Sequence, residues 1–374
     1  MSDKSGVIKT LPFWGLLVLF MFFVPASFIG QQEDDVHLMT GKEHQEVDEE
    51  EFKAGEMIIE HITDAYEWHI ISVGEHHVSI YLPVIIYDEG EWHVFMSSKL
   101  YHGNKNYKGY FISKEDMNAG KLVKLDSEGK EIRPTLDISL TKNVLSILMS
   151  MALMIFVFVS IAKSYKKRKG HAPKGLQSFM EPLILFIRDD VAKSSIGEKK
   201  YERYVPFLLT IFFFILFNNL LGIIPFFPGG ANITGNIGVT GVLAAFTFII
   251  TTVSGNKNYW KHLINAPGVP WWLKIPIPLM PIVEIMGVFT KPFVLMVRLF
   301  ANMSAGHIII LGFISLIFIF GKMSLGLGYG VSVVSVGFSI FMDFLELLVA
   351  FIQAYVFTLL SALYFGMATE EAHH

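Results

Sequence analysis

Uncharged apolar runs of membrane length constrain this chain more than any other feature of its sequence. The run NVLSILMSMALMIFVFVSIA, residues 143–162, holds no ionisable side chain, and similar runs cover residues 205–227 and 233–255. A helix of about 20 apolar residues crosses the hydrocarbon core of a bilayer. The runs therefore predict several membrane-spanning helices.

The overall composition agrees with a membrane protein that carries one polar segment. Of the 374 residues, 52% are apolar and 33 are phenylalanine, and the mean hydropathy is +0.47. Soluble domains are usually about 45–50% apolar. The chain holds no cysteine, which excludes disulfides and thiolate metal sites. We predict an all-α polytopic membrane domain over residues 141–374, with about five spans, preceded by a small β-rich extramembrane domain.

The last two predicted spans are too long to stand upright in a bilayer. Residues Ile275 to Phe320 form a segment of about 45 residues with four prolines, and a second overlong segment runs from Val331 to about Met367. At 1.5 Å per residue, each exceeds the ~30 Å hydrocarbon core. We expect two long helices at the C-terminus, tilted or kinked, joined by an outer turn at GKMSLGLGYG.

The N-terminal third differs from the rest. Residues 1–27 combine a basic start with a short apolar core and small residues at PAS, the pattern of a signal peptide; an uncleaved anchor is the alternative. Residues 28–140 hold β-branched and aromatic runs such as HITDAYEWHIISV, separated by turn signals, which predict strands. This domain contains eight histidines, but alternation along strands explains them without a metal, so we predict no metal site.

Charge asymmetry predicts the topology. Residues 31–140 hold about 23 acids and 10 bases, whereas residues 163–203 hold about 11 bases and 5 acids. Because basic residues favour the cytoplasmic side, the run KSYKKRKG places the end of the first mature span inside the cell. The acidic domain is then extracytoplasmic and the C-terminus cytoplasmic. The amphipathic segment GLQSFMEPLILFIRDDVAKSSIG is expected on the cytoplasmic interface.

Ionisable side chains deep in the two long segments are the candidate functional residues. A charge at the centre of a bilayer costs from about 3 to more than 10 kcal/mol, so such residues mark function by default. The candidates are Glu284, Arg298, Asn302 and His307 on the first segment and Asp343, Glu346 and Gln353 on the second. Lys291, beside a proline, is expected to be structural.

Helical spacing arranges the first four candidates by depth. Arg298 is expected near mid-membrane, with Asn302 one turn on along the same face. His307 would lie about 13 Å nearer the outside and about half a turn round the helix, and Glu284 about 21 Å nearer the cytoplasm. Glu284 would therefore line a polar path from inside.

On the second segment, Asp343, Glu346 and Gln353 are expected to share one stripe, with Gln353 level with Arg298. The two acids would join His307 in a polar path from outside. An arginine between the paths stays charged at any relevant pH and blocks direct proton hopping. Since no acid of this chain is expected at its depth, its partner carboxylate is expected from another subunit.

Three sequence runs surround the arginine: EIMGVFTKP, RLFANMSAGH and FLELLVAFIQAYVFTLLSALYFGMATEEAHH. Together they resemble subunit a of F-type rotary ATP synthases, and the similarity extends from about Lys163 to Glu371. The spacing of that family is also found in the candidate residues Arg298, Asn302, His307, Glu346 and Gln353 and in the terminal MATEE.

This resemblance implies a stator subunit that faces a rotating ring of c subunits and is held by the peripheral stalk of subunit b. Protons would enter by one half-channel, ride on ring carboxylates and leave by the other, with Arg298 preventing a direct leak. The resemblance implies no cofactor, nucleic acid or bound nucleotide, and the sequence has no GxxxxGK[ST] pattern. ATP chemistry would belong to other subunits, and the chain would lie in the lipid bilayer of the bacterial inner membrane.

Two other function classes stay open from the residues alone. A self-contained proton-coupled secondary transporter would use Glu284, Arg298 and Glu346 as its own sites, although the chain shows no internal repeat of the kind common in transporters. A sensor or assembly protein would use the acidic domain as its working part. Transport by the chain alone, or loss of function on deletion of residues 31–140, would favour these alternatives.

Overall fold

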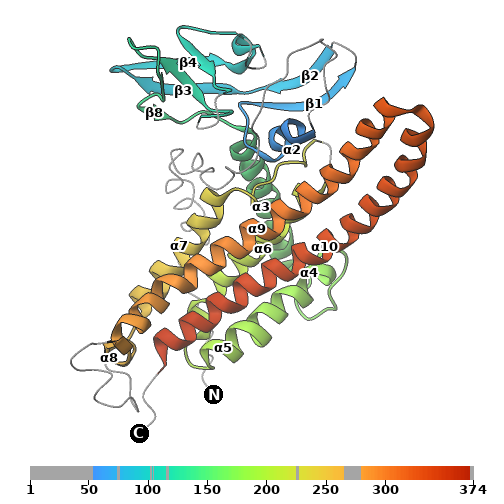
Figure 1. Ribbon diagram of the computed structural model, residues 1–374. Coiled ribbons are helices and arrows are strands. Elements are labelled where there is room, and N and C mark those ends of the chain that lie inside the picture. Colours follow the sequence, from blue (N-terminus) through green and yellow to red (C-terminus); the bar gives the residue numbers. More distant parts are fainter. Residues whose placement is uncertain are drawn as a thin grey trace, which may run out of the picture.

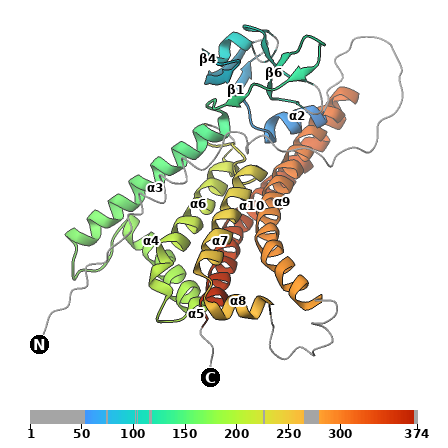
Figure 2. The same ribbon diagram turned by 90° about the vertical axis from the view of Figure 1, so that its left-hand side faces the viewer.

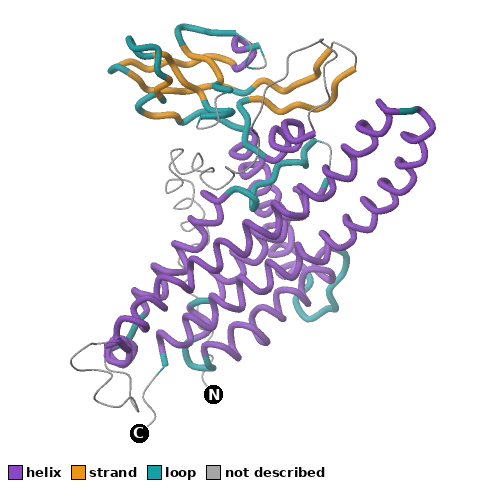
Figure 3. Tube along the Cα trace, viewed as in Figure 1, coloured by secondary structure: helices purple, strands orange, loops and turns teal. Residues whose placement is uncertain are grey.

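The computed structural model describes residues 54–73, 76–101, 103, 105–114, 118–224, 227–264 and 279–370. A β-rich domain, residues 54–140, stands on one end of a helical bundle, residues 141–370 (Figure 1). Figure 3 separates the two parts by colour, with the strands gathered at that end of the bundle. The signal peptide expected at residues 1–27 lies outside the described residues.

The β-rich domain consists of short antiparallel strands, as the sequence predicts. The sheets pair β1 (Glu67–Val73) with β2 (His76–Tyr81), β3 (Pro83–Asp88) with β4 (Glu91–Met96) and β8 (Leu136–Asp137), and β6 (Leu122–Leu125) with β5 (Tyr110–Ile112) and β7 (Glu131–Ile132). A 3-10 turn, η2 (Ser97–Leu100), follows β4. Alternation along β3 buries Val84 and Ile86 completely. The run HITDAYEWHIISV is only partly a strand, because its first two residues end helix α2 (Ala54–Ile62).

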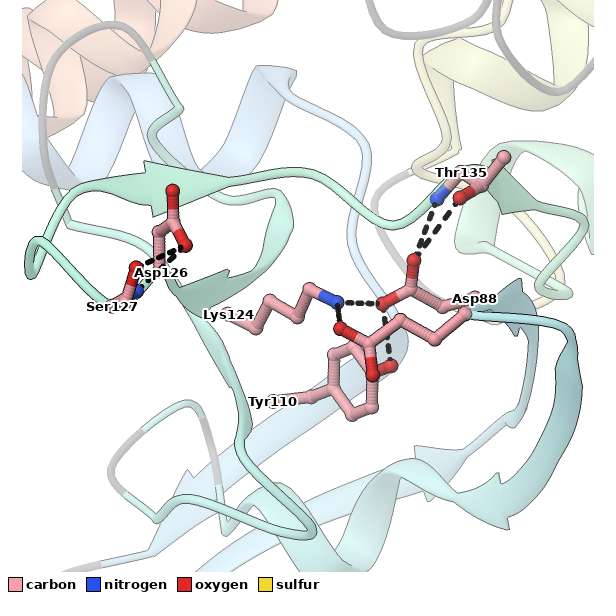
Figure 4. A network of polar contacts seen from close by, with 7 residues as sticks. Asp88, Tyr110, Lys124, Asp126, Ser127 and Thr135 are labelled. Atoms are coloured by element: carbon pink, nitrogen blue, oxygen red, sulfur yellow. Dashed lines mark hydrogen bonds and ion pairs between the residues drawn. The ribbon is translucent and has the colours of Figure 1, made fainter.

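A buried ion pair stabilises the end of β3 (Figure 4). Asp88 is 3% exposed and accepts hydrogen bonds from the hydroxyls of Tyr110 at 2.8 Å and Thr135 at 3.1 Å, while Lys124 Nζ lies 2.5 Å from its carboxylate. Burial raises the pKa of Asp88, but these donors outweigh burial and lower it to about 2. The turn predicted from the sequence follows at once, with Gly90 at a φ of 88° that favours glycine.

Five helices in the described part of the bundle are long and apolar enough to cross a membrane. They are α3 (Lys142–Lys167), α6 (Val205–Ile223), α7 (Ile237–Ser254), α9 (Leu279–Met323) and α10 (Leu325–Thr369). Shorter segments are α4 (Leu176–Leu185), the π-helix η3 (Phe186–Lys193), α5 (Ser194–Ile196), the 3-10 helix η4 (Tyr201–Arg203) and α8 (Lys257–Ile264). The core centres on α6, where Phe212 and Phe213 are fully buried and which packs against α3 and α10.

The amphipathic segment expected on the membrane interface packs its apolar face into the bundle. Ile187 and Val191 of η3 are at most 1% exposed, and η3 contacts α6 and α10. Arg188 and Asp189 on the opposite face are exposed and pair with each other at 2.7 Å. The apolar face of η3 is therefore covered by protein, whereas Phe179 and Leu176 of the preceding α4 stay exposed.

The two long helices form an antiparallel pair of 45 residues each. At 1.5 Å per residue each is about 68 Å long, and Figure 1 shows them side by side, with their turn projecting past the other helices. The helix α9 continues through Pro292 without interruption. The chain reverses at Ser324, within the predicted turn run GKMSLGLGYG, but this one residue alone separates the two helices and the rest of the run is helical. Two glycines of the run also allow close packing: a Cβ on Gly328 would lie 2.8 Å from Gly321 Cα.

Among the contacts that join the β-rich domain to the bundle, two place it over α6 and α9. Trp68 of β1 is 4% exposed and packs edge-to-face on Phe227, with ring centroids 5.2 Å apart. Phe227 lies just after α6, so this contact fixes the domain over that helix. The second contact is made by α2, which packs against α9 beneath the sheets (Figure 2).

Candidate functional site

The long helices bring His307 of α9 against Glu346 of α10. Nδ1 of His307 lies 3.1 Å from Oε1 of Glu346, and Glu346 is 4% exposed. Gly306 makes this approach possible, because a Cβ there would lie only 2.8 Å from the same oxygen. The sequence predicted these two residues on one path, and the structure places them in contact.

Polar groups of α6 and of the loop after it surround the pair. The Asn219 amide donates a hydrogen bond to the Ala350 carbonyl at 3.3 Å and accepts one from the Thr234 hydroxyl at 2.6 Å. A Cβ on Gly222 would lie 3.7 Å from Nε2 of His307. The loop, α6 and the two long helices therefore meet at one buried polar site.

Several buried polar atoms at this site make no hydrogen bond within the described protein. They are Oε1 and Oε2 of Glu346, Oδ1 of Asn218 and Nδ2 of Asn232. Folded proteins rarely leave such atoms without a partner, and ordered water is the usual one. The site is thus suited to hold water in contact with a carboxylate and an imidazole, the side chains that most often transfer protons.

Arg298 points away from this interior site. It is the twentieth of the 45 residues of α9, and its side chain is exposed, as is that of Asn302 one turn further on. Its neighbour Leu299 is 1% exposed, so the helix turns that residue and not the arginine toward the bundle. Within the residues described, no acidic side chain forms an ion pair with Arg298.

Lys291, expected to be structural, packs on α10. Its ammonium lies 5.7 Å from the centroid of the Tyr364 ring and 4.0 Å from the sulfur of Met367. Arg298 also interacts electrostatically with Tyr364. The tyrosine therefore lies near both cations without neutralising either of them.

The remaining candidates lie on both sides of Arg298. Glu284 is half-buried near the start of α9 and interacts electrostatically with Tyr259 of α8, whose pKa is raised by burial and by this carboxylate. Gln353 is 7% exposed on the bundle side of α10. Along α9, Arg298 lies about 21 Å from Glu284 and about 13 Å from His307.

The expected stripe of Asp343, Glu346 and Gln353 is only partly correct. Glu346 and Gln353 are buried on one face, whereas Asp343 is exposed. Seven residues turn a helix by about 700°, which nearly restores the direction, but three residues leave a difference of about 60°. Asp343 still interacts electrostatically with Glu346 and lies beside the pair, not in line with it.

Sequence reasoning missed the uncharged residues that shape the site. Gly306 sets the distance between the long helices, Thr234 orients Asn219, and Ser304 donates a hydrogen bond to the Gly235 carbonyl at 3.3 Å. The only signal in the sequence was the position of small residues such as Ser304 and Gly306 close to His307. In the described ranges, no three His, Asp or Glu side chains gather closely enough to hold a metal ion.

Comparison with known proteins gives two family matches. Residues 144–366 match the family described as ATP synthase A chain, and residues 57–144 match a domain of unknown function (DUF8433). A protein from Chloroherpeton thalassium named ATP synthase subunit a is 48% identical over 244 residues, which are 64% of this chain and 69% of that protein. A protein of the same name from Myxococcus xanthus is 43% identical over 245 residues, 64% of this chain and 76% of that protein.

Proposed function

The chain belongs to the ATP synthase A chain family, and we propose that Arg298 separates the two proton half-channels of this subunit. The chain is the proton-channel stator subunit of the membrane sector and a multi-pass membrane protein of the ATP synthase complex. One observation carries the role of Arg298: a guanidinium half-way along an apolar helix is exposed and has no acidic partner among the described residues. Such a charge needs an anion, and we assign it to a neighbouring subunit.

The face around Arg298 fits a ring of c subunits that carries this anion. Val294 and Ile309 are exposed on it, together with the small residues Ala301 and Ala305. Small residues let helix backbones approach closely in a membrane. A ring carboxylate that arrives here would lose its proton to the path, because the adjacent guanidinium favours the ionised form.

Protons reach and leave the ring on opposite sides of Arg298. From outside, they pass the wet site of His307 and Glu346, with Asp343 beside it and Asn302 between that site and the arginine. Toward the cytoplasm, they leave along a path that includes Glu284, with Gln353 at mid-depth. The guanidinium holds no transferable proton at any relevant pH, so protons cross only when the ring turns.

The topology follows from charge. The β-rich domain lies outside the bacterial inner membrane and the C-terminus inside, since the basic residues cluster at the far end of α3. We assign residues 1–27 to a signal peptide, 28–140 to the extracytoplasmic domain and 141–374 to the membrane domain. The peripheral stalk of subunit b would hold the bundle against the turning ring.

Purification of the tagged chain under mild detergent tests this assignment. We expect a small two-span protein with an acidic residue at mid-membrane to co-purify, and we expect the chain alone in liposomes to move no protons. Proton transport by the purified chain without any ring would contradict the stator function and favour a self-contained transporter.

A further inference from the structure

The β-rich domain contacts the bundle where protons are proposed to enter. Its helix α2 packs on α9, the helix of His307 (Figure 2). Its Trp68 packs on Phe227 in the loop after α6. The domain therefore covers the outer end of the site instead of hanging from a flexible tether. Its family match, a domain of unknown function over residues 57–144, assigns it no role.

A polar cluster lies at this contact. Lys142, at the start of α3, is 8% exposed, and its ammonium donates a hydrogen bond to the His61 carbonyl in the last turn of α2 at 3.2 Å. Asp64 accepts a hydrogen bond from the Asn143 backbone amide at 2.9 Å. A cation at a helix C-terminus stabilises it, so Lys142 and Asp64 join the end of α2 to the start of α3.

The cluster also faces the proton site itself. The ring of His307 interacts electrostatically with both His61 and Lys142. The side chain of His61 is exposed, so one end of the cluster is open to the surroundings and the other is close to the site.

The first turns of α3 add buried polar groups that lack partners. Both polar atoms of the Asn143 side chain and the hydroxyl of Ser146 make no hydrogen bond within the described protein, although these residues are 1% and 0% exposed. They are three residues apart and share a face. Because ordered water is the usual partner of buried polar atoms of this kind, we expect water beside these two side chains of α3.

We propose that α2 and the first turns of α3 form the outer vestibule of the proton path, in which His61 and Asp64 pass protons through water to His307 and Glu346. This inference rests on the proposed function. Lys142 is a positioning residue that holds α2 over α9. In each hop, one O–H or N–H bond of the donor breaks as an O–H or N–H bond forms on the acceptor, so that one proton moves along the hydrogen-bonded water. The excess of acids in residues 31–140 raises the local concentration of cations at the entrance.

The ionisation of Asp64 agrees with this role. Burial raises the pKa of its carboxyl above the ordinary value, against the hydrogen bonds that it accepts. A carboxyl with a raised pKa takes up and releases protons more readily near neutral pH than an ordinary surface aspartate does.

Cysteine labelling tests whether the vestibule is wet and on the path. The natural chain has no cysteine, so Asn143→Cys and Ser146→Cys each place a single thiol in the subunit. Spheroplasts are treated with a charged methanethiosulfonate, and ATP-driven proton pumping is then measured in vesicles. We expect labelling at both positions and pumping about tenfold lower. Val94→Cys, at a side chain 66% exposed on β4, is the control that should be labelled without loss.

Absence of labelling at both buried positions, or labelling without loss of pumping, would overturn the vestibule proposal.

A second test uses substitutions alone and needs no labelling reagent. Asp64→Asn keeps the acceptor oxygen but cannot carry a proton, and it should lower pumping about tenfold in a complex that assembles normally. His61→Ala should act likewise, whereas His171→Ala, at an exposed histidine beyond the other end of α3, should not.

The two levels of the proposal can be separated. Arg298→Ala is measured in parallel with the vestibule variants. If Arg298→Ala pumps normally, the proposed function fails. If Arg298→Ala is inactive while Asp64→Asn and His61→Ala pump at the wild-type rate, the vestibule fails and the stator function stands.

Discussion

Gly306→Ala adds one methyl group where the two long helices bring His307 and Glu346 together. The new Cβ would lie 2.8 Å from Oε1 of Glu346 and 3.1 Å from its Cδ, closer than packed atoms normally approach. The carboxylate is the end of a flexible side chain, so we expect it to rotate while the helices stay in place. Its 3.1 Å contact with His307 would then be lost.

The expected effect is large on proton flow and small on assembly. Losing a close contact between a charged group and its partner costs about 1.5–3 kcal/mol, and about 1.4 kcal/mol on a barrier changes a rate tenfold. Proton pumping should therefore fall about 10- to 100-fold. A rotated carboxylate costs about 1 kcal/mol, which leaves the amount of assembled complex nearly unchanged.

ATP-driven acidification of inverted vesicles, divided by the amount of assembled complex, measures this loss. Gly312→Ala is the matched control, because a Cβ at that position of α9 meets no atom within 4 Å. An assembled Gly306→Ala complex that pumps like the wild type would refute the reasoning, and so would an equal loss in both variants.

Two further predictions concern stability. Gly366→Ala should destabilise the chain by about 1–3 kcal/mol and lower the amount of complex. Its new Cβ would clash with the Ser195 backbone carbonyl, which cannot rotate away. Gly337→Ala, at a position in open space on the same helix, should have no such effect. The β-rich domain should lose about 2 kcal/mol of stability as the pH falls from about 4 to about 2, since the folded pKa of Asp88 is about 2 and its ordinary value is 3.8. Hydrogen exchange at β3 measures this loss, and Asp88→Asn should remove the pH dependence; an unchanged pH dependence in that variant would contradict the assignment.

The predictions made from hydropathy agree best with the structure. The apolar runs correctly gave helices long enough to cross a membrane, and the length of the last two segments predicted an overlong pair. These features depend on local composition, which one sequence contains in full. Alternation of inward and outward side chains is likewise seen in strand β3, where Val84 and Ile86 are completely buried.

Features that depend on packing between elements could not be predicted. The turn between the long helices was placed in the correct run, but its length of one residue and the close contact of Gly321 with Gly328 depend on how the two helices pack. Asp343 was placed with Glu346 because helical spacing gives only an approximate face. The docking of α2 on α9 joins segments more than 200 residues apart, and no periodicity in either segment indicates the other.

The most direct test of the account is the proton pumping of an Arg298→Ala complex, with Arg298→Lys beside it and the amount of assembled complex as the reference. Because the guanidinium must meet a ring carboxylate, we expect no ATP-driven pumping in Arg298→Ala. Little pumping is expected in Arg298→Lys, because a compact ammonium is placed and hydrated differently. Normal pumping by the assembled Arg298→Ala complex would contradict the claim that this charge separates the half-channels.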